Sequence, residues 1–166
     1  MTEWALLAPG PSAPSLVSRA LRCERIGVVG NAFQLVDCAE FLVAVDRGWW
    51  LKHPGARSFE ARMFSSSGAP DTESTGLPPD VNSGVAGLEL AKRFGATSIR
   101  LYGFDMHGSH YFGPYANGLR NTTETRRKVM LRQFNDWHAA NRSIEVINCT
   151  PGSAITCFPF GEDHAG

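Results

Sequence analysis

A helix, a glycine turn, a strand and a polar loop follow one another between residues 82 and 110, and this order constrains the fold more than any other part of the chain. Asn82 or Ser83 can cap the helix by accepting a backbone N–H, and Gly95 can end it. The short run at 99–102 is typical of a buried strand. Together these elements form half of a βαβ unit, which predicts a largely parallel sheet.

Polar and titratable residues follow that strand. Asp105, His107 and His110 lie beyond its carboxyl end, where open α/β sheets bind their ligands. The helix start at Ser83-Gly84 should lie on the same edge of the sheet. We therefore predict a site for an anionic ligand here, because backbone N–H groups at a helix start can hold an anion.

The same three side chains are the catalytic candidates. His107 or His110 could act as a general base, since histidine titrates close to neutral pH. Asp105 or Asp46 could orient that base or hold a divalent metal. The alternatives are a turn or capping role for Asp105 and structural or surface roles for the two histidines.

Further strands can be placed along the chain, with helices or turns between them. They are expected at 4–7, 25–29, 41–45, 57–64, 99–102 and 144–147. This alternation predicts an α/β fold, a three-layer Rossmann-like domain with a mainly parallel sheet of about six strands. We expect a single domain over residues 1–160, followed by a flexible tail at 161–166.

Small or polar residues recur where these strands end. Gly10-Pro11-Ser12, Gly30-Asn31 and Asp46 follow the first three strands. Turn chemistry can explain any single case, because Gly, Asn and Asp favour turns. Their recurrence at one edge of the sheet favours a shared binding site. The candidate ligand-binding residues are Gly10, Ser12, Asn31, Asp46, Trp49, Asn82, Ser83, Gly84, Asn148, Thr150 and Ser153.

Two segments leave alternatives open. Trp49 and Trp50 are adjacent in a short helix expected at 48–53, and two adjacent tryptophans of one helix should not both face the core. Core packing is the favoured interpretation, and the alternative is that one of the two lines the pocket, where it could stack on a flat base. The long loop at 65–81 is either a mobile lid over the site or a passive excursion, and its position just before Asn82 favours the lid.

The longest helix is expected at 122–141. Met130, Phe134 and Trp137 recur at helical spacing and should form its core face. The opposite side is basic. It is either a solvated surface, or one arginine near the helix start reaches an anionic ligand. The basic residues are Arg126, Arg127, Lys128 and Arg132.

Composition excludes several classes of protein. The chain carries 16 basic and 16 acidic residues, so it lacks the positive charge expected of a nucleic-acid polymer binder. No run approaches the roughly 20 apolar residues of a membrane span, and the N-terminus does not resemble a signal peptide. The four cysteines form no C-x-x-C pair, which argues against structural zinc and favours reduced thiols in a cytoplasm. Both standard nucleotide fingerprints, G-x-G-x-x-G and the P-loop, are missing.

The order of the short motifs resembles the bacterial sialyltransferase and hydroxymethylpterin pyrophosphokinase-like superfamily. The matching motifs are Gly10-Pro11-Ser12, Asn31, Asp46, Asn82-Ser83-Gly84 and Gly103-Phe104-Asp105-Met106. The chain is also similar to a family of small tailed-phage proteins. That similarity includes Asn-Ala-Phe at 31–33, Asp-x-x-Trp-Trp at 46–50 and Asn-Cys-Thr-Pro-Gly-Ser-Ala at 148–154, and the resemblance extends over about residues 5–159.

The resemblance implies nucleotide binding. In the sialyltransferases the matching segments bind the cytidine nucleotide of the donor sugar, which points to Gly10, Ser12, Asn31, Ser83 and Gly84 in this chain. The expected partner is therefore a nucleotide-derived small molecule, in the cytoplasm of an infected bacterial host. The sequence leaves open whether the protein uses a cofactor and whether it forms a homo-oligomer.

Three functions compete at this stage. A phage-encoded binding protein could hold the nucleotide-derived molecule and sequester a host immune signal. A glycosyl- or phosphoryl-type transferase could use a nucleotide-activated donor, with His107 or His110 as base. A structural phage component with a relict pocket would bind no ligand.

Overall fold

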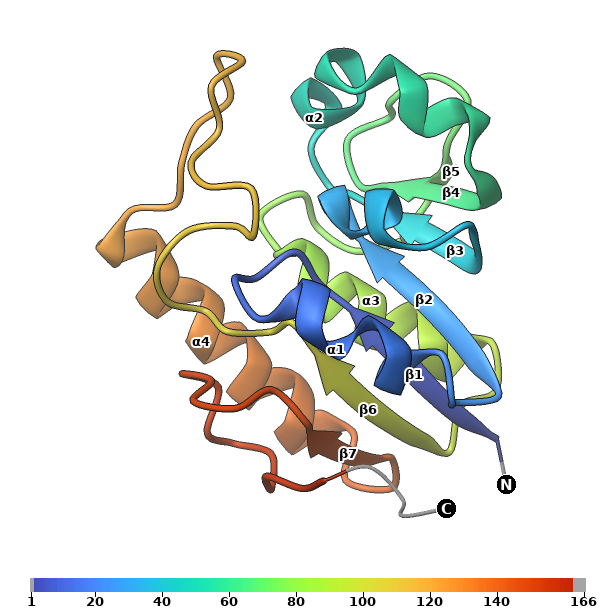
Figure 1. Ribbon diagram of the computed structural model, residues 1–166, viewed down its shortest axis with the longest axis vertical. Helices are drawn as coiled ribbons and strands as arrows, with labels where there is room; N and C mark the ends of the chain where they lie inside the picture. Colours follow the sequence, from blue (N-terminus) through green and yellow to red (C-terminus); the bar gives the residue numbers. More distant parts are fainter. Residues whose placement is uncertain (1, 163–166) are drawn as a thin grey trace.

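An all-parallel sheet determines how the elements are arranged. The computed structural model describes residues 2–162, and within them seven strands lie in the order β5-β4-β3-β2-β1-β6-β7 (Figure 1). The strands are β1 (Glu3–Leu7), β2 (Arg25–Val29), β3 (Cys38–Val43), β4 (Glu60–Ser65), β5 (Glu73–Ser74), β6 (Ser98–Tyr102) and β7 (Glu145–Asn148). The predicted α/β fold with a parallel sheet is confirmed, although the sheet has one strand more than the expected six or so.

Helices cover both faces of this sheet. They are α1 (Ala13–Ala20), η1 (Gly30–Leu35), α2 (Arg47–Lys52), η2 (Pro54–Ser58), α3 (Ser83–Arg93) and α4 (Glu124–Ala140), where η marks a 3-10 helix. One apolar core lies under α3 and α4, and a second lies under α1, η1 and α2 on the opposite face. None of these helices, within residues 2–162, is both long and apolar enough to cross a membrane.

Strand β1 lies at the centre and separates the two cores. Because successive side chains of a strand point to opposite faces, Leu6 packs in the first core, whereas Ala5 and Leu7 pack in the second. β1 pairs with β2 on one side and with β6 on the other. The chain order of the strands therefore reverses at β1, and open α/β sheets bind ligands at such a point.

The segment at 65–81 does not form a lid. It contains β5, which extends the sheet beside β4, and none of its residues lines the cavity described below. Arg62 donates two hydrogen bonds to the Glu73 carboxylate (3.0 and 2.8 Å), and Arg93 donates to the carbonyl of Thr75. These contacts hold the segment at the sheet edge, and they explain the additional strand.

Two other local expectations need correction. The strand expected at 57–64 begins only at Glu60, because the chain from Pro54 to Ser58 forms the 3-10 helix η2. The favoured core packing of the tryptophans is confirmed, but the expectation that Trp49 and Trp50 cannot both face the core is wrong, since α2 is short and has neighbours on both sides. Trp50 donates its indole N–H to the carbonyl of Ala44 (2.8 Å), while Trp49 also contributes part of its surface to the cavity.

Candidate ligand-binding site

A cavity of about 740 Å³ lies at the carboxyl ends of β1, β2, β3 and β6. The starts of α3 and α4 and the long loop between β6 and α4 complete its walls. Its volume lies in the range usual for small-molecule sites. The lining residues are 8–10, 29–30, 44–46, 49, 82–84, 103–110, 114–115, 120–123, 126–127, 130 and 134.

Of the candidate ligand-binding residues, six line the cavity: Gly10, Asp46, Trp49, Asn82, Ser83 and Gly84. All three catalytic candidates, Asp105, His107 and His110, line it as well. The loops that contribute them lie far apart in the sequence, and the parallel sheet brings them to one edge as the motif pattern indicates. The remaining candidates, described below, occupy supporting positions around this cavity.

Ser12 supports the site through Asp105. The Ser12 hydroxyl donates to Asp105 Oδ1 (2.8 Å) and the Ser12 backbone N–H lies 3.3 Å from the same oxygen. The Asp105 side chain is buried, with a residue exposure of 3%. A side chain at Gly10 would place its Cβ 2.1 Å from Asp105 Oδ1, so only glycine lets the two loops approach this closely.

Asn31 is a buried hydrogen-bonding centre beside the cavity. Its Oδ1 accepts the indole N–H of Trp49 (2.9 Å), which fixes the amide orientation because an indole nitrogen can only donate. The Asn31 amide nitrogen therefore donates to Nε2 of His53 (3.0 Å). His53 must carry its proton on Nδ1, which lies 2.8 Å from the carbonyl oxygen of Trp49. Asn31 thus positions a cavity wall, and it lines a shallower neighbouring hollow rather than the cavity itself.

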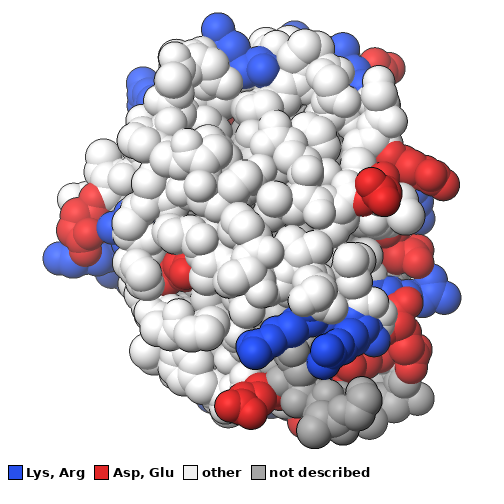
Figure 2. Space-filling view, viewed as in Figure 1, with Lys and Arg blue, Asp and Glu red and all other residues white. Residues whose placement is uncertain are grey.

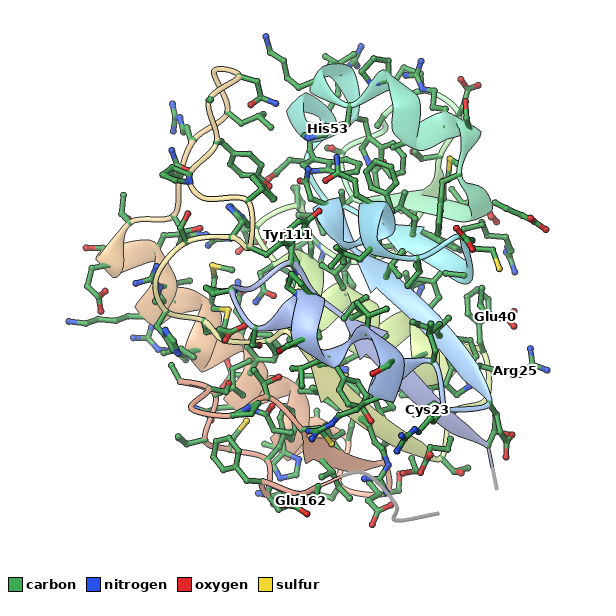
Figure 3. All side chains as sticks on the ribbon, in the orientation of Figure 1. Cys23, Arg25, Glu40, His53, Tyr111 and Glu162 are labelled. Carbon is green, nitrogen blue, oxygen red and sulfur yellow. The ribbon has the colours of Figure 1, made fainter. Side chains whose placement is uncertain are left out.

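The loop after β6 folds back over η1 and α2. The Tyr111 hydroxyl donates to Gln34 Oε1 (2.7 Å), and Tyr115 lies near the His53 ring, with 6.4 Å between ring centroids. Figure 3 labels Tyr111 and His53, which reach this region from the β6 loop and from the end of α2. Burial raises the pKa of Tyr115 to about 12, so its hydroxyl stays protonated at neutral pH.

His110 is held within an aromatic cluster at the cavity wall. Its ring stacks on Phe112, with centroids 4.8 Å apart and an interplanar angle of 3°, and it also contacts Tyr115 at 4.4 Å. Burial lowers the pKa of His110 from its ordinary value, against a smaller opposing effect of the hydrogen bond with Gly113. Its Nδ1 is buried and has no hydrogen-bond partner among the described residues. The neutral ring therefore retains an unused nitrogen.

His107 has a different environment. It is exposed, and its Nε2 lies 3.0 Å from the carbonyl oxygen of Gly152. Since a carbonyl can only accept, Nε2 carries the proton and Nδ1 is the basic nitrogen of the neutral ring.

Three arginines give the cavity a positive side: Arg120, Arg126 and Arg127. Arg126 donates to the carbonyl of Asp80 (2.8 Å), and Arg127 donates to the carbonyl of Gly108 (2.9 Å). A guanidinium carries five N–H donors, so each retains further hydrogen-bonding capacity. This arrangement favours the hypothesis that arginines near the helix start reach a ligand. The sequence pattern did not predict Arg120 and Tyr115 as lining residues, and the glycine- and aromatic-rich stretch before the capped helix was the available signal. Met130 was expected in the core face of α4; it is only partly buried there and lines the cavity, whereas Phe134 and Trp137 are buried.

Asn148, Thr150 and Ser153 lie beneath the loop that follows β6 and do not line the cavity. The Thr150 hydroxyl oxygen accepts the backbone N–H of Phe104 (3.1 Å), and the Ser153 hydroxyl donates to the Phe104 carbonyl. Asn148 Oδ1 in turn accepts the N–H of Thr150 (3.1 Å). These three residues fix the backbone that presents Asp105.

Within residues 2–162, no group of three or more His, Cys, Asp or Glu side chains is arranged to hold a metal ion. The acidic residues of the cavity wall are Asp46 and Asp105, which contribute as separate side chains.

Comparison with known proteins places the fold. No protein-family model matches the chain, and no curated protein is significantly similar to it in sequence. Two solved structures share its fold, both of the sialyltransferase CstII from Campylobacter jejuni. The complex with cytidine-5'-monophosphate is 14% identical, with a TM-score of 0.56 and coverage of 98% of this chain and 85% of that chain. The complex with CMP-3FNeuAc is also 14% identical, with a TM-score of 0.57 and coverage of 96% and 86%.

Proposed function

We propose that the cavity binds a nucleotide-derived small molecule. The observation that carries this proposal is that one cavity of suitable size is lined by three kinds of group that could bind a nucleotide. Arg126 and Arg127 offer guanidinium donors for a phosphate, and the helix start at Ser83-Gly84 adds backbone N–H groups. Trp49 and its neighbours offer an aromatic wall against which a base could lie.

The fold similarity supports the same proposal. The matched structures show the sialyltransferase in complex with cytidine-5'-monophosphate and with CMP-3FNeuAc, both of which contain a nucleotide. The loops that resemble the nucleotide-binding segments of such enzymes meet at the edge of the sheet in this chain. We expect the nucleotide to occupy the side of the cavity formed by Gly10, Ser83 and Gly84.

Calorimetric titration against a panel of nucleotides tests the proposal. The panel contains the four ribonucleoside monophosphates, a CMP-sugar and inorganic phosphate. We expect saturable binding of at least one nucleotide, tighter than that of inorganic phosphate, because the base and ribose add contacts. Absence of binding across the panel would refute the proposal and favour a structural role with a relict pocket.

A transferase that uses a nucleotide-activated donor is the second candidate. It is favoured by His110, which lines the cavity and is kept neutral by its lowered pKa. In such a reaction the base takes the proton of an acceptor hydroxyl. The oxygen of that hydroxyl forms a bond to the donor carbon. The bond from that carbon to the nucleotide phosphate breaks, and the nucleotide leaves with the electron pair. His107 is the alternative base, with Asp105 as an orienting group.

Release of free nucleotide from a CMP-sugar separates the two candidates. A transferase releases CMP in the presence of an acceptor alcohol, and replacement of both His107 and His110 by alanine should abolish that release. Release that persists at the wild-type rate in the double variant would remove this mechanism.

A more specific version of the binding proposal is that this protein is phage-encoded and sequesters a host immune nucleotide signal. The resemblance of the sequence motifs to tailed-phage proteins motivates it. It requires tight binding without chemical change, so recovery of the bound nucleotide unaltered after long incubation is the expected result. Conversion of the tightest ligand into a product would contradict it.

A further inference from the structure

Gln133 connects α4 to the start of α3. Its Oε1 accepts two hydrogen bonds from Asn82, one from the backbone N–H (3.0 Å) and one from the side-chain amide (2.8 Å). Its Nε2 donates to the carbonyl of Asp80 (2.8 Å). Gln133 does not itself line the cavity, whereas Asn82 does. The glutamine therefore acts on the site only through the segment that it holds.

The hydrogen bonds leave one orientation for both amides. Asn82 Oδ1 accepts the N–H of Val85 (3.0 Å) and so caps α3, which forces the Asn82 amide nitrogen towards Gln133. Gln133 must then present its oxygen to Asn82 and its nitrogen to Asp80. A glutamate could make the first contact but not the second, and methionine could make neither.

The turn that Gln133 holds is also fixed by other neighbours. The Ser83 hydroxyl accepts the backbone N–H of Val45 (3.0 Å). A Cβ at Gly84 would lie 2.8 Å from Cζ of Phe134, so α3 begins in direct contact with α4. Asn82, Ser83 and Gly84 all line the cavity. Their position relative to the arginines of α4 therefore depends on contacts between the two helices.

We infer that Gln133 is a positioning residue of the cavity. It fixes the Asn82–Gly84 turn relative to Arg126, whose guanidinium shares the Asp80 carbonyl with Gln133. This inference rests on the proposed nucleotide binding and deepens it: the turn and Arg126 together receive the phosphate. Loss of Gln133 should weaken binding of the charged nucleotide more than binding of the uncharged nucleoside, because the nucleoside lacks the group that the turn contacts.

The test compares CMP with cytidine by calorimetry in wild type, Gln133→Met, Gln133→Glu and the control Asn135→Ala. Asn135 is an exposed residue of the same helix and does not line the cavity. We expect Gln133→Met to weaken CMP binding by about tenfold, which is the size of effect expected if the displaced turn loses about one hydrogen bond to the phosphate, and cytidine binding by less than about twofold. Asn135→Ala should match wild type with both ligands.

Parallel weakening of CMP and cytidine in Gln133→Met would show a merely structural role and overturn the inference, as would unchanged CMP affinity. If Gln133→Met does not fold, Gln133→Glu decides, since it keeps the contacts to Asn82 and loses the one to Asp80. It should likewise weaken CMP selectively, and wild-type CMP affinity in that variant would overturn the inference. If the wild-type protein binds another nucleotide of the panel instead of CMP, the same comparison is made with that nucleotide and its nucleoside. Absence of wild-type binding across the whole panel would refute the proposed function, and the role of Gln133 with it.

Discussion

Asn31 illustrates how single residues shape the cavity without touching its contents. Its amide oxygen holds the Trp49 indole and its amide nitrogen holds His53, so a single side chain aligns two rings. The His53 ring stacks on Trp49 with centroids 4.4 Å apart. The geometry requires a donor and an acceptor at the same position, which asparagine provides and aspartate does not.

Replacing Asn31 with Asp should therefore destabilise the fold. The carboxylate can still accept the indole N–H of Trp49, but it has no proton to donate to Nε2 of His53. We expect a loss of about 1–3 kcal/mol in the free energy of unfolding at pH 8. Urea unfolding followed by tryptophan fluorescence measures this loss, with Asn135→Asp as control. Unchanged stability at pH 8 would contradict the assigned hydrogen bonds.

His110 should make the free energy of unfolding increase with pH, whereas an ion-paired histidine makes it decrease. Burial lowers its pKa in the folded state below the ordinary 6.5 or so of the unfolded chain. The unfolded state then binds more protons, so this contribution is fully present above about pH 6.5 and is lost as the pH falls through the folded-state pKa. His110→Gln should show a smaller loss of stability than wild type between pH 8 and pH 5. Identical pH profiles for the two proteins would argue against this assignment.

The residues that form the cavity wall were more predictable than their individual contacts. Asp105, Ser83 and His110 could be placed at the cavity because each follows or begins an element whose direction the sequence pattern gives. Ser12 and Asn31 could not be placed in the same way. Their polar groups are used by Asp105, 93 residues away, and by Trp49, 18 residues away, and such pairings leave no mark on local sequence.

At the scale of elements, the first turn of α4 and the loop before it form the side of the cavity that is rich in arginine. Thr123 caps α4 by accepting the backbone N–H of Arg126 (3.1 Å). Arg127 ties this turn to the β6 loop through the Gly108 carbonyl. These hydrogen bonds join the two elements into one wall of the cavity.

Arg127→Ala should weaken nucleotide binding while Arg132→Ala should not. Arg127 lines the cavity, whereas Arg132 is an exposed residue of the same helix outside the lining. We expect about a tenfold loss of CMP affinity for the first variant, typical of a charge-assisted hydrogen bond, and a much weaker salt dependence of the remaining binding. Equal affinities of the two variants, measured by calorimetry at two salt concentrations, would remove Arg127 from the phosphate site.

The edge strand β5 should be irrelevant to binding. Glu73→Ala removes the exposed ion pair with Arg62 that holds the 65–81 segment at the sheet edge. Because this segment does not line the cavity, CMP affinity should stay within about twofold of wild type, and stability should change little, as for most surface ion pairs. A larger change in affinity would revive the lid interpretation for residues 65–81.

Elements with strong periodicity were predictable from sequence, and those determined by tertiary contacts were not. The strands β1 and β2 and the helix α4 lie within a few residues of their expected positions. The two-residue strand β5 is too short to produce a pattern and depends on contacts such as Arg62 to Glu73. The 3-10 helix η2 displaced the start of the expected fourth strand, because Pro54 begins a tight turn of helix.

At the scale of the whole molecule, the reversal of strand order at β1 brings the functional loops together. The loop after β1 contributes Gly10 and the loop after β6 contributes Asp105, and β1 and β6 are neighbours in the sheet. On the face shown in Figure 2, charged side chains lie mainly towards the edges, and no extended basic patch covers the described residues there.

We propose that residues 1–160 form one domain, as the sequence suggests, since both cores share the central sheet. The expected tail at 161–166 lies largely outside the described residues 2–162. The sequence left open whether the protein forms a homo-oligomer, and a measurement of its mass in solution tests this.

A crystal structure grown with CMP tests the central claim most directly. The account predicts one nucleotide in the cavity at the carboxyl edge of the sheet, with its phosphate within hydrogen-bond distance of Arg126 or Arg127 and of the Ser83-Gly84 turn. A nucleotide bound elsewhere on the molecule, or an empty cavity at a saturating concentration of CMP, would contradict it.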